Sequence, residues 1–170
     1  MHFKKVEPLK FLARQKFFSS KVWPKCTIEI FNEISNLSSE VYGLRAAEGE
    51  WPIGKLLNHF VNAAEWFRFL LTGEKWSELP RITNSEVLIQ MRDYLKNIDQ
   101  TLIAEASKPD ADVTFTGDDG ELHKATRSLI LSQAIMHTAE HKGQLATVLK
   151  IHGYFLDLDR YDVWSYESKN

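Results

Sequence analysis

PIGKLLNHFVNAAEWFRFLLTG, residues 52–73, is the stretch of sequence that decides the fold class. Pro52 suits the first turn of a helix, and Gly73 stands where a C-cap glycine belongs. Between them, apolar residues recur at steps of three and four, which is one stripe of a helix with 3.6 residues per turn: Ile53, Leu56, Leu57, Phe60, Ala64, Phe67 and Leu71. The stretch therefore predicts an amphipathic helix from about Pro52 to Leu71.

Three further stretches show helical spacing. Residues 85–106 carry a second apolar stripe, with Asn84 or Ser85 as the N-cap. A long pattern over residues 126–152 ends at Gly153. A less regular pattern, from Leu9 to Leu37, also favours helix, and we expect Pro24 to kink or divide it.

One short stretch differs from the helical pattern. Residues 113–123 place β-branched and aromatic residues on either side of Asp119-Gly120, which is typical of a β-hairpin. The predicted fold class is therefore all-α: an up-down four-helix bundle with a small β-hairpin between the third and fourth helices. On length, residues 1–170 are expected to form a single domain.

Composition and charge exclude several classes of protein. The 21 Lys and Arg against 23 Asp and Glu give a net charge of −2, which gives no reason to expect binding to nucleic acid. No run of 18 apolar residues is present to span a membrane, and residues 1–8 lack the apolar core of a signal peptide. The single cysteine, Cys26, fits a reducing compartment, so we expect a cytoplasmic protein.

The main chemical feature is a pair of histidines in the last predicted helix, His137 and His141. Residues four apart lie one turn above each other, so the two imidazoles point the same way and can converge on one metal ion. They share their side of the helix with apolar residues and are expected to face the interior. Unpaired polar rings there would cost about 1–3 kcal/mol each, a cost that metal binding removes. The alternative is two core histidines satisfied by hydrogen bonds or water.

His59, at the edge of the apolar stripe of the 52–71 helix, is a candidate third ligand. Three histidines plus water form an open, catalytic type of zinc coordination, and nickel or iron accepts the same donors. The alternative is an ordinary histidine at the boundary of the core. His137-Thr-Ala-Glu140-His141 also spells the inverzincin signature, but only 29 residues follow His141, with no further long helix to supply a carboxylate ligand.

These residues resemble the DinB/YfiT-like family of metal-binding four-helix-bundle proteins over roughly Leu9 to Tyr161. The resemblance depends on Leu56-Leu57-Asn58-His59, on Leu70-Leu71-Thr72-Gly73 and, above all, on His137-x-x-x-His141-Lys142-Gly143-Gln144. It implies a divalent metal, usually zinc or nickel, held by His59, His137 and His141. Where the family often has a further histidine and an arginine, this chain has Glu140 and Lys142, which present different hydrogen-bond geometry to a ligand.

Other candidates carry weaker signals. His123 in the hairpin reads as a surface residue, and His2 lies at a terminus. His152 is about 16 Å along the helix from His141, too far to share its metal. Trp51 and Trp66 either line a pocket or pack in the core, whereas Glu65 and Asp162 are either general bases or solvated acids. Cys26 has no base nearby and is expected to be a buried or boundary thiol.

Two functional hypotheses follow. The first is an enzyme in which the metal activates a water or a thiol, since relatives of this family include S-transferases that use a low-molecular-weight thiol and others that look like metal-dependent hydrolases. Trp66 and its neighbours would shape the pocket for a small-molecule substrate. The second is a non-enzymatic, metal-stabilised bundle that serves as a binding or interaction module. Homodimers are common in the family, so a homodimer is possible here; the sequence assigns no catalytic residue.

Overall fold

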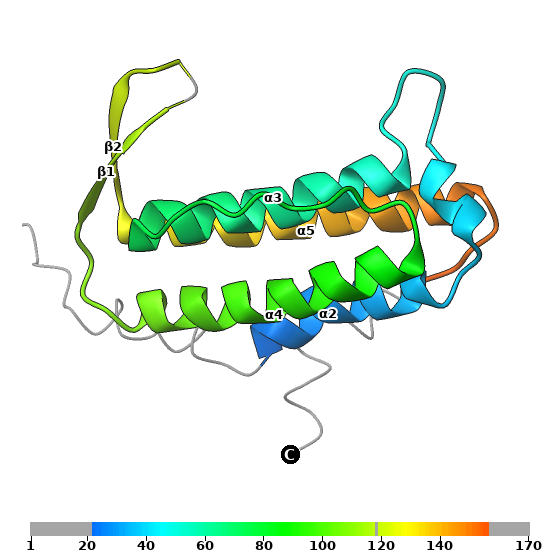
Figure 1. Ribbon diagram of the computed structural model, residues 1–170, viewed down its shortest axis with the longest axis horizontal. Coiled ribbons are helices and arrows are strands. Elements are labelled where there is room, and N and C mark those ends of the chain that lie inside the picture. The colour runs from blue at the N-terminus through cyan, green and yellow to red at the C-terminus, as the bar shows by residue number, and fades with distance from the viewer. Residues whose placement is uncertain (1–21, 118, 157–170) are drawn as a thin grey trace, which may run out of the picture.

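The computed structural model describes residues 22–117 and 119–156, and they form four α-helices and one β-hairpin (Figure 1). The elements follow in the order α2 (Val22–Ser35), the short 3₁₀-helix η1 (Ser39–Gly43), α3 (Ile53–Thr72), α4 (Ser85–Ala106), β1 (Asp112–Thr116), β2 (Leu122–Thr126) and α5 (Arg127–Ile151). The described part of the chain is therefore mostly α-helical, as the sequence predicts.

The helix boundaries follow from local capping signals. α3 begins directly after Pro52 and ends at Gly73, whose φ of 69° is the left-handed conformation that glycine adopts readily. The side chain of Asn84 caps α4 by accepting a hydrogen bond from the Val87 N–H. Thr126 caps α5 in the same way. The predicted boundaries of these three helices are confirmed to within one residue or two.

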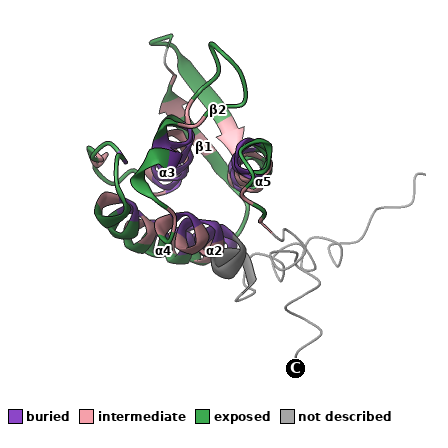
Figure 2. Cartoon of the chain, turned by 90° about the vertical axis from the view of Figure 1, so that its right-hand side faces the viewer, coloured by how far each residue is buried: buried purple, intermediate pink, exposed green. Residues whose placement is uncertain are grey.

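The helices share one hydrophobic core. Residues of the predicted α3 stripe are all buried, from Ile53 at one end to Leu71 at the other. Buried residues of α2, α4 and α5 join the same cluster, and Figure 2 shows them on the sides of the helices that face one another. α3 packs against α5 and α4, and α2 packs against α4. This packing fixes α3 and α5 side by side, which are the two helices that carry the candidate histidines.

The predicted hairpin is present. β1 and β2 pair antiparallel from Asp112↔Thr126 to Thr116↔Leu122, and the strand β2 leads directly into α5. Gly120 has a φ of 78°, so the turn uses a conformation that L side chains rarely adopt. Figure 1 shows the hairpin standing at one end of the helices.

The segment between α3 and α4, residues 73–84, runs back along α3. At one end Arg68 donates to the Lys75 carbonyl at 2.8 Å, and at the other Asn58 bonds the Pro80 carbonyl and the Ile82 N–H at 3.0 and 2.9 Å. Gly54 permits this contact, because a Cβ there would lie 2.8 Å from the Ile82 carbonyl oxygen. α4 therefore begins beside the start of α3, and the two helices run in the same direction (Figure 1).

The predicted alternating up-down order is thus wrong for α3 and α4. Antiparallel neighbours need only a short loop, whereas an extended segment of 12 residues reaches about 40 Å. That reach exceeds the length of α3, about 30 Å at 1.5 Å per residue. The length of the connection therefore allows the chain to return to the start of α3 before α4 begins.

The helix expected over residues 9–37 is only partly covered by the described residues. The described part of α2 runs from Val22 to Ser35 and includes Pro24, so the expectation that Pro24 kinks or divides a longer helix depends on residues outside the described range. The expected helix over residues 9–21 lies outside the described residues, as does the side chain of Cys26. Within the described residues, no helix is both long enough and apolar enough to cross a membrane.

Candidate metal centre

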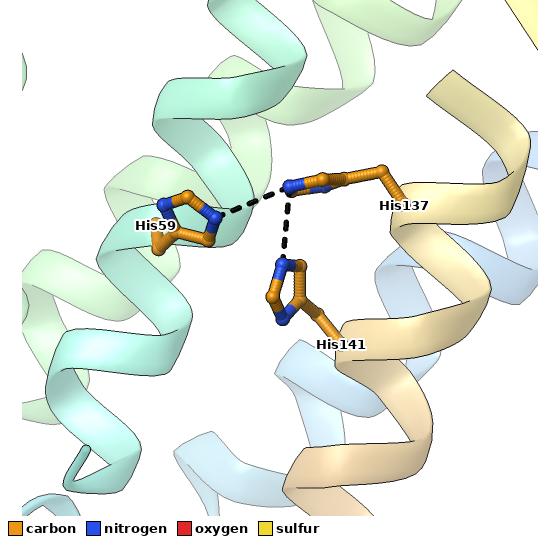
Figure 3. Close-up of side chains that lie close together, drawn as sticks. All are labelled: His59, His137 and His141. Atoms are coloured by element: carbon orange, nitrogen blue, oxygen red, sulfur yellow. Dashed lines mark hydrogen bonds between the residues drawn. The ribbon is translucent and has the colours of Figure 1, made fainter. Parts of the chain in front are cut away.

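The three predicted histidines meet between α3 and α5 (Figure 3). His59 projects from the second turn of α3, while His137 and His141 project from one side of α5, one turn apart. His141 is buried, with 6% of its surface exposed, and His59 and His137 are half-buried. Residues 78 positions apart in the sequence thus converge because α3 and α5 pack side by side.

The spacing of the ring nitrogens suits a metal ion. The Nε2 atom of His137 lies 3.2 Å from Nε2 of His59 and 3.0 Å from Nε2 of His141. Zinc–nitrogen bonds of about 2.0–2.1 Å in a tetrahedral arrangement place the nitrogens about 3.3 Å apart. All three ligand atoms lie within 4.8 Å of one another, so the three histidines could share one divalent cation.

The hydrogen bonds of His141 fix which of its nitrogens is free. Gln144 directs its amide NH₂ toward Oε1 of Glu140 at 3.4 Å, so its own Oε1 accepts from the Nδ1–H of His141 at 2.7 Å. A neutral imidazole protonated on Nδ1 has a bare lone pair on Nε2. That lone pair faces Nε2 of His137. Nε2 of His137 carries at most one proton, so it can donate a hydrogen bond to His141 or to His59 but not to both. A cation between the rings satisfies all three nitrogens.

Electrostatics favour the neutral form of two of the three rings, His59 and His137. Burial, together with the neighbouring His141 and His59 rings, lowers the pKa of His137 to about 4. Burial and His141 also lower the pKa of His59. Neutral imidazoles are the form that binds metal, so these side chains need not lose a proton first near pH 7.

A pocket of about 600 Å³ opens onto the cluster. His59 and His141 form part of its wall, and Trp51, which is 39% exposed, lies edge-on to the His59 ring with centroids 5.1 Å apart. The remaining lining residues come from the segment before α3 and from the two helices: Ala46, Glu50, Leu56, Glu140, Gly143, Gln144, Thr147 and Val148. The candidate metal centre is therefore reachable by a small molecule.

The other histidines lie apart from this cluster. His123 is exposed on the hairpin, as predicted, and bonds Asp119 at 2.9 Å. His152, at the end of α5, bonds the Arg45 carbonyl at 2.9 Å. His2 lies outside the described residues.

Glu65 is neither a general base at the pocket nor a solvated acid, and both readings of it are wrong. Its carboxylate is fully buried and accepts two hydrogen bonds from Arg68, at 2.7 Å each. The Tyr94 hydroxyl and the Ser77 N–H donate to it at 2.9 Å. This cluster fastens the returning segment and α4 to α3, and its four donors leave the carboxylate no role toward a ligand. The other candidate base, Asp162, lies outside the described residues.

The two tryptophans have different surroundings. Trp51 lines the pocket, whereas Trp66 does not. Trp66 packs in an aromatic group beneath the hairpin, stacked on Phe69 and edge-on to Trp76 and Phe115. The expectation that Trp66 shapes the substrate pocket is therefore wrong for the pocket at the histidines.

Comparison with known families agrees with this geometry. The model of the DinB family matches residues 10–158 of the chain. The chain belongs to the DinB family. This DinB protein gives no match in a comparison with curated proteins. Family membership confirms the resemblance drawn from the His59 and His137–Gln144 motifs.

One residue of this DinB site had no role assigned from sequence. Gln144 matches the family motif, yet the pattern alone does not show that its side chain holds His141. The signal is its position three residues after His141, which places both side chains on one face of α5. Orienting contacts of this kind set the tautomer and basicity of metal-binding histidines.

Proposed function

We propose that this DinB protein is a metal-dependent thiol S-transferase acting on a small molecule, with zinc or nickel held by His59, His137 and His141. The observation that carries the proposal is the pocket that opens onto His59 and His141. A metal that only tied α3 to α5 would need no such opening. Three imidazole donors suit zinc and nickel equally, and neither is favoured by the donor set.

The chain's own residues supply binding and orientation. His59 and His137 present neutral imidazoles, and Gln144 holds His141 with Nε2 directed at the cluster. Trp51 and Leu56 offer apolar surface beside them for the carbon skeleton of a substrate. A divalent ion held there with an open position lowers the pKa of a bound thiol or water.

The proposed reaction joins two substrates, a thiol and an electrophile. The thiol releases its proton to solvent, its sulfur forms a bond to an electrophilic carbon, and the leaving group departs with its electron pair. The pocket contributes by holding the two reactants together, which replaces a chance encounter by an oriented one. If water takes the place of the thiol, the same site acts as a hydrolase.

A non-enzymatic role is the second candidate. The histidines connect α3 and α5 across the core, so a bound ion would stabilise the fold by binding only the folded chain. A metal-stabilised bundle of this kind would serve as a binding or interaction module. It predicts metal-dependent stability without turnover.

The proposal includes a cytoplasmic location and a small-molecule or thiol partner, with neither nucleic acid nor membrane as a partner. A lone cysteine and a net charge of −2 support these points. A homodimer is also proposed. Its support is that α5 exposes three large apolar side chains, Leu129, Met136 and Ile151, which are 57–68% exposed.

The test is turnover of small thiols with an electrophile such as a haloalkane or an activated nitroarene. Zinc- or nickel-loaded protein, produced without a histidine tag, should form thioether faster than the buffer control. His59→Ala should abolish this rate, and His123→Ala, a change to an exposed histidine on the hairpin, should leave it intact. Equal rates in the His59→Ala variant and the wild type would remove the transferase, and hydrolysis without thiol would favour the hydrolase.

A further inference from the structure

The pocket at the histidine cluster is lined by acidic but not by basic side chains. Its charged lining residues are two glutamates, Glu50 from the segment before α3 and Glu140 from α5. Among the described residues, neither carboxylate forms an ion pair with lysine or arginine; Glu140 accepts a hydrogen bond from the amide of Gln144, and its negative charge acts to raise the pKa of the nearby His59 and His137 rings. The described lining contains no lysine or arginine.

One cation, Lys55, contacts the tryptophan of this wall. It lies over the Trp51 ring, 4.2 Å from its centroid, and lines a different hollow, although its charge also acts on His59. Lys55 is therefore not one of the residues that line the pocket. A positive group entering the pocket would meet the two carboxylates.

The rest of the wall is apolar or neutral. Leu56 and Val148, with the Trp51 ring, give the same pocket apolar surface for a short carbon chain. A ligand that fits this arrangement has a metal-binding atom at one end and a positive charge at the other. An anionic ligand would instead face two like charges, which is unfavourable.

We propose that the pocket selects small thiols that carry a positively charged amine, with the sulfur directed to the histidines and the ammonium group to Glu50 and Glu140. The inference rests on the proposed function, since the sulfur needs the metal centre. It assigns Glu50 and Glu140 as specificity-determining residues, with no part in the bond-making step.

The experiment compares cysteamine, 2-mercaptoethanol and mercaptoacetate, three short thiols that end in a positive, a neutral and a negative group. Calorimetric titration into zinc-loaded protein gives the dissociation constant of each thiol. The quantity of interest is the ratio of cysteamine to 2-mercaptoethanol affinity, compared between the wild type and the double variant Glu50→Gln/Glu140→Gln. Because the same thiols are used throughout, their different intrinsic acidities cancel in this comparison.

We expect the double variant to lower this ratio about three- to tenfold, as two partly exposed ion pairs would. Mercaptoacetate should gain affinity in the same variant. Glu48→Gln, which removes an exposed carboxylate of the same segment outside the pocket lining, should leave the ratio unchanged.

An unchanged ratio in the double variant, or an equal fall in Glu48→Gln, would overturn the inference while leaving the metal site and the transferase intact. Failure of the wild type to bind either zinc or nickel would overturn both proposals. The zinc content of each protein, measured before the titration, separates the two kinds of failure.

Discussion

Helix α3 carries two polar clusters whose hydrogen bonding is opposite in character. In the cluster of Glu65 and Arg68, the carboxylate has four donors and the guanidinium also reaches Glu74 and the Lys75 carbonyl. In the histidine cluster, three ring nitrogens face one another with too few protons to satisfy them. The first cluster is complete within the protein, whereas the second could hold a cation.

This difference separates polar groups that stabilise the fold from polar groups that are available to a ligand. A buried polar group is costly unless it is paired, so a satisfied cluster needs nothing further, and an unsatisfied one indicates a missing partner. The pocket supports the distinction, since it opens onto His59 and His141 but is not lined by Glu65 or Arg68.

The largest expected effect comes from breaking the satisfied cluster. Glu65→Gln leaves the Arg68 charge without its buried counter-charge, and we expect a loss of about 3 kcal/mol in the free energy of unfolding, measured in urea. Glu74→Gln is the matched control, because this partner of Arg68 is 69% exposed and its loss should cost less than about 1 kcal/mol. Zinc stoichiometry should stay the same in both variants. Equal losses of stability would show that the cluster is not the structural element described here.

Acid should protonate Glu65 and so weaken the same cluster. Burial alone raises the pKa of the Glu65 carboxyl, but hydrogen bonds from Arg68, Ser77 and Tyr94 together lower it below its ordinary value of 4.5. A carboxyl with a lowered pKa in the folded state stabilises the protein fully above the unfolded value and loses that contribution as the pH falls through the folded one. The stability difference between the wild type and Glu65→Gln should therefore be constant near pH 7 and shrink below about pH 4.5. A difference that grows in acid would contradict this assignment.

A smaller effect is expected from loosening the histidine cluster without removing a histidine. Gln144→Ala removes the acceptor that orients His141, and we expect zinc affinity to fall about 10- to 100-fold. Gln133→Ala changes an exposed glutamine of the same helix and serves as the control. Competition with a coloured chelator gives both affinities. Equal affinities in the two variants would mean that Gln144 does not position His141.

Most of the fold was predictable because the signals that set helix ends are local. Pro52, Gly73 and Asn84 mark α3 and the start of α4 by their own backbone or side-chain chemistry. The direction of α4 was not predictable in this way. It depends on contacts such as those of Asn58 with the returning segment, which are formed between residues more than 20 positions apart.

The candidate site was predictable to a similar extent. The four-residue spacing of His137 and His141 sets their common direction, the place of His59 at the edge of the apolar stripe makes it the third candidate, and the family resemblance supports all three. Glu65 was misread because its sequence neighbours do not reveal that Tyr94 and Ser77 converge on it from other segments. The charge of the pocket was equally hidden, since Glu50 and Glu140 meet there only in three dimensions.

Metal binding by the three histidines is tested most directly by equilibrium titration of zinc into metal-free protein that carries no histidine tag. We predict one tightly bound ion per chain in the wild type and in His123→Ala, and loss of that tight site in His137→Ala. At a free zinc concentration of 100 times the dissociation constant, the wild type should gain about 2.7 kcal/mol of stability that His137→Ala does not gain. Absence of stoichiometric zinc from the wild type, or equal binding by His137→Ala, would contradict the assignment of His59, His137 and His141 as a metal centre.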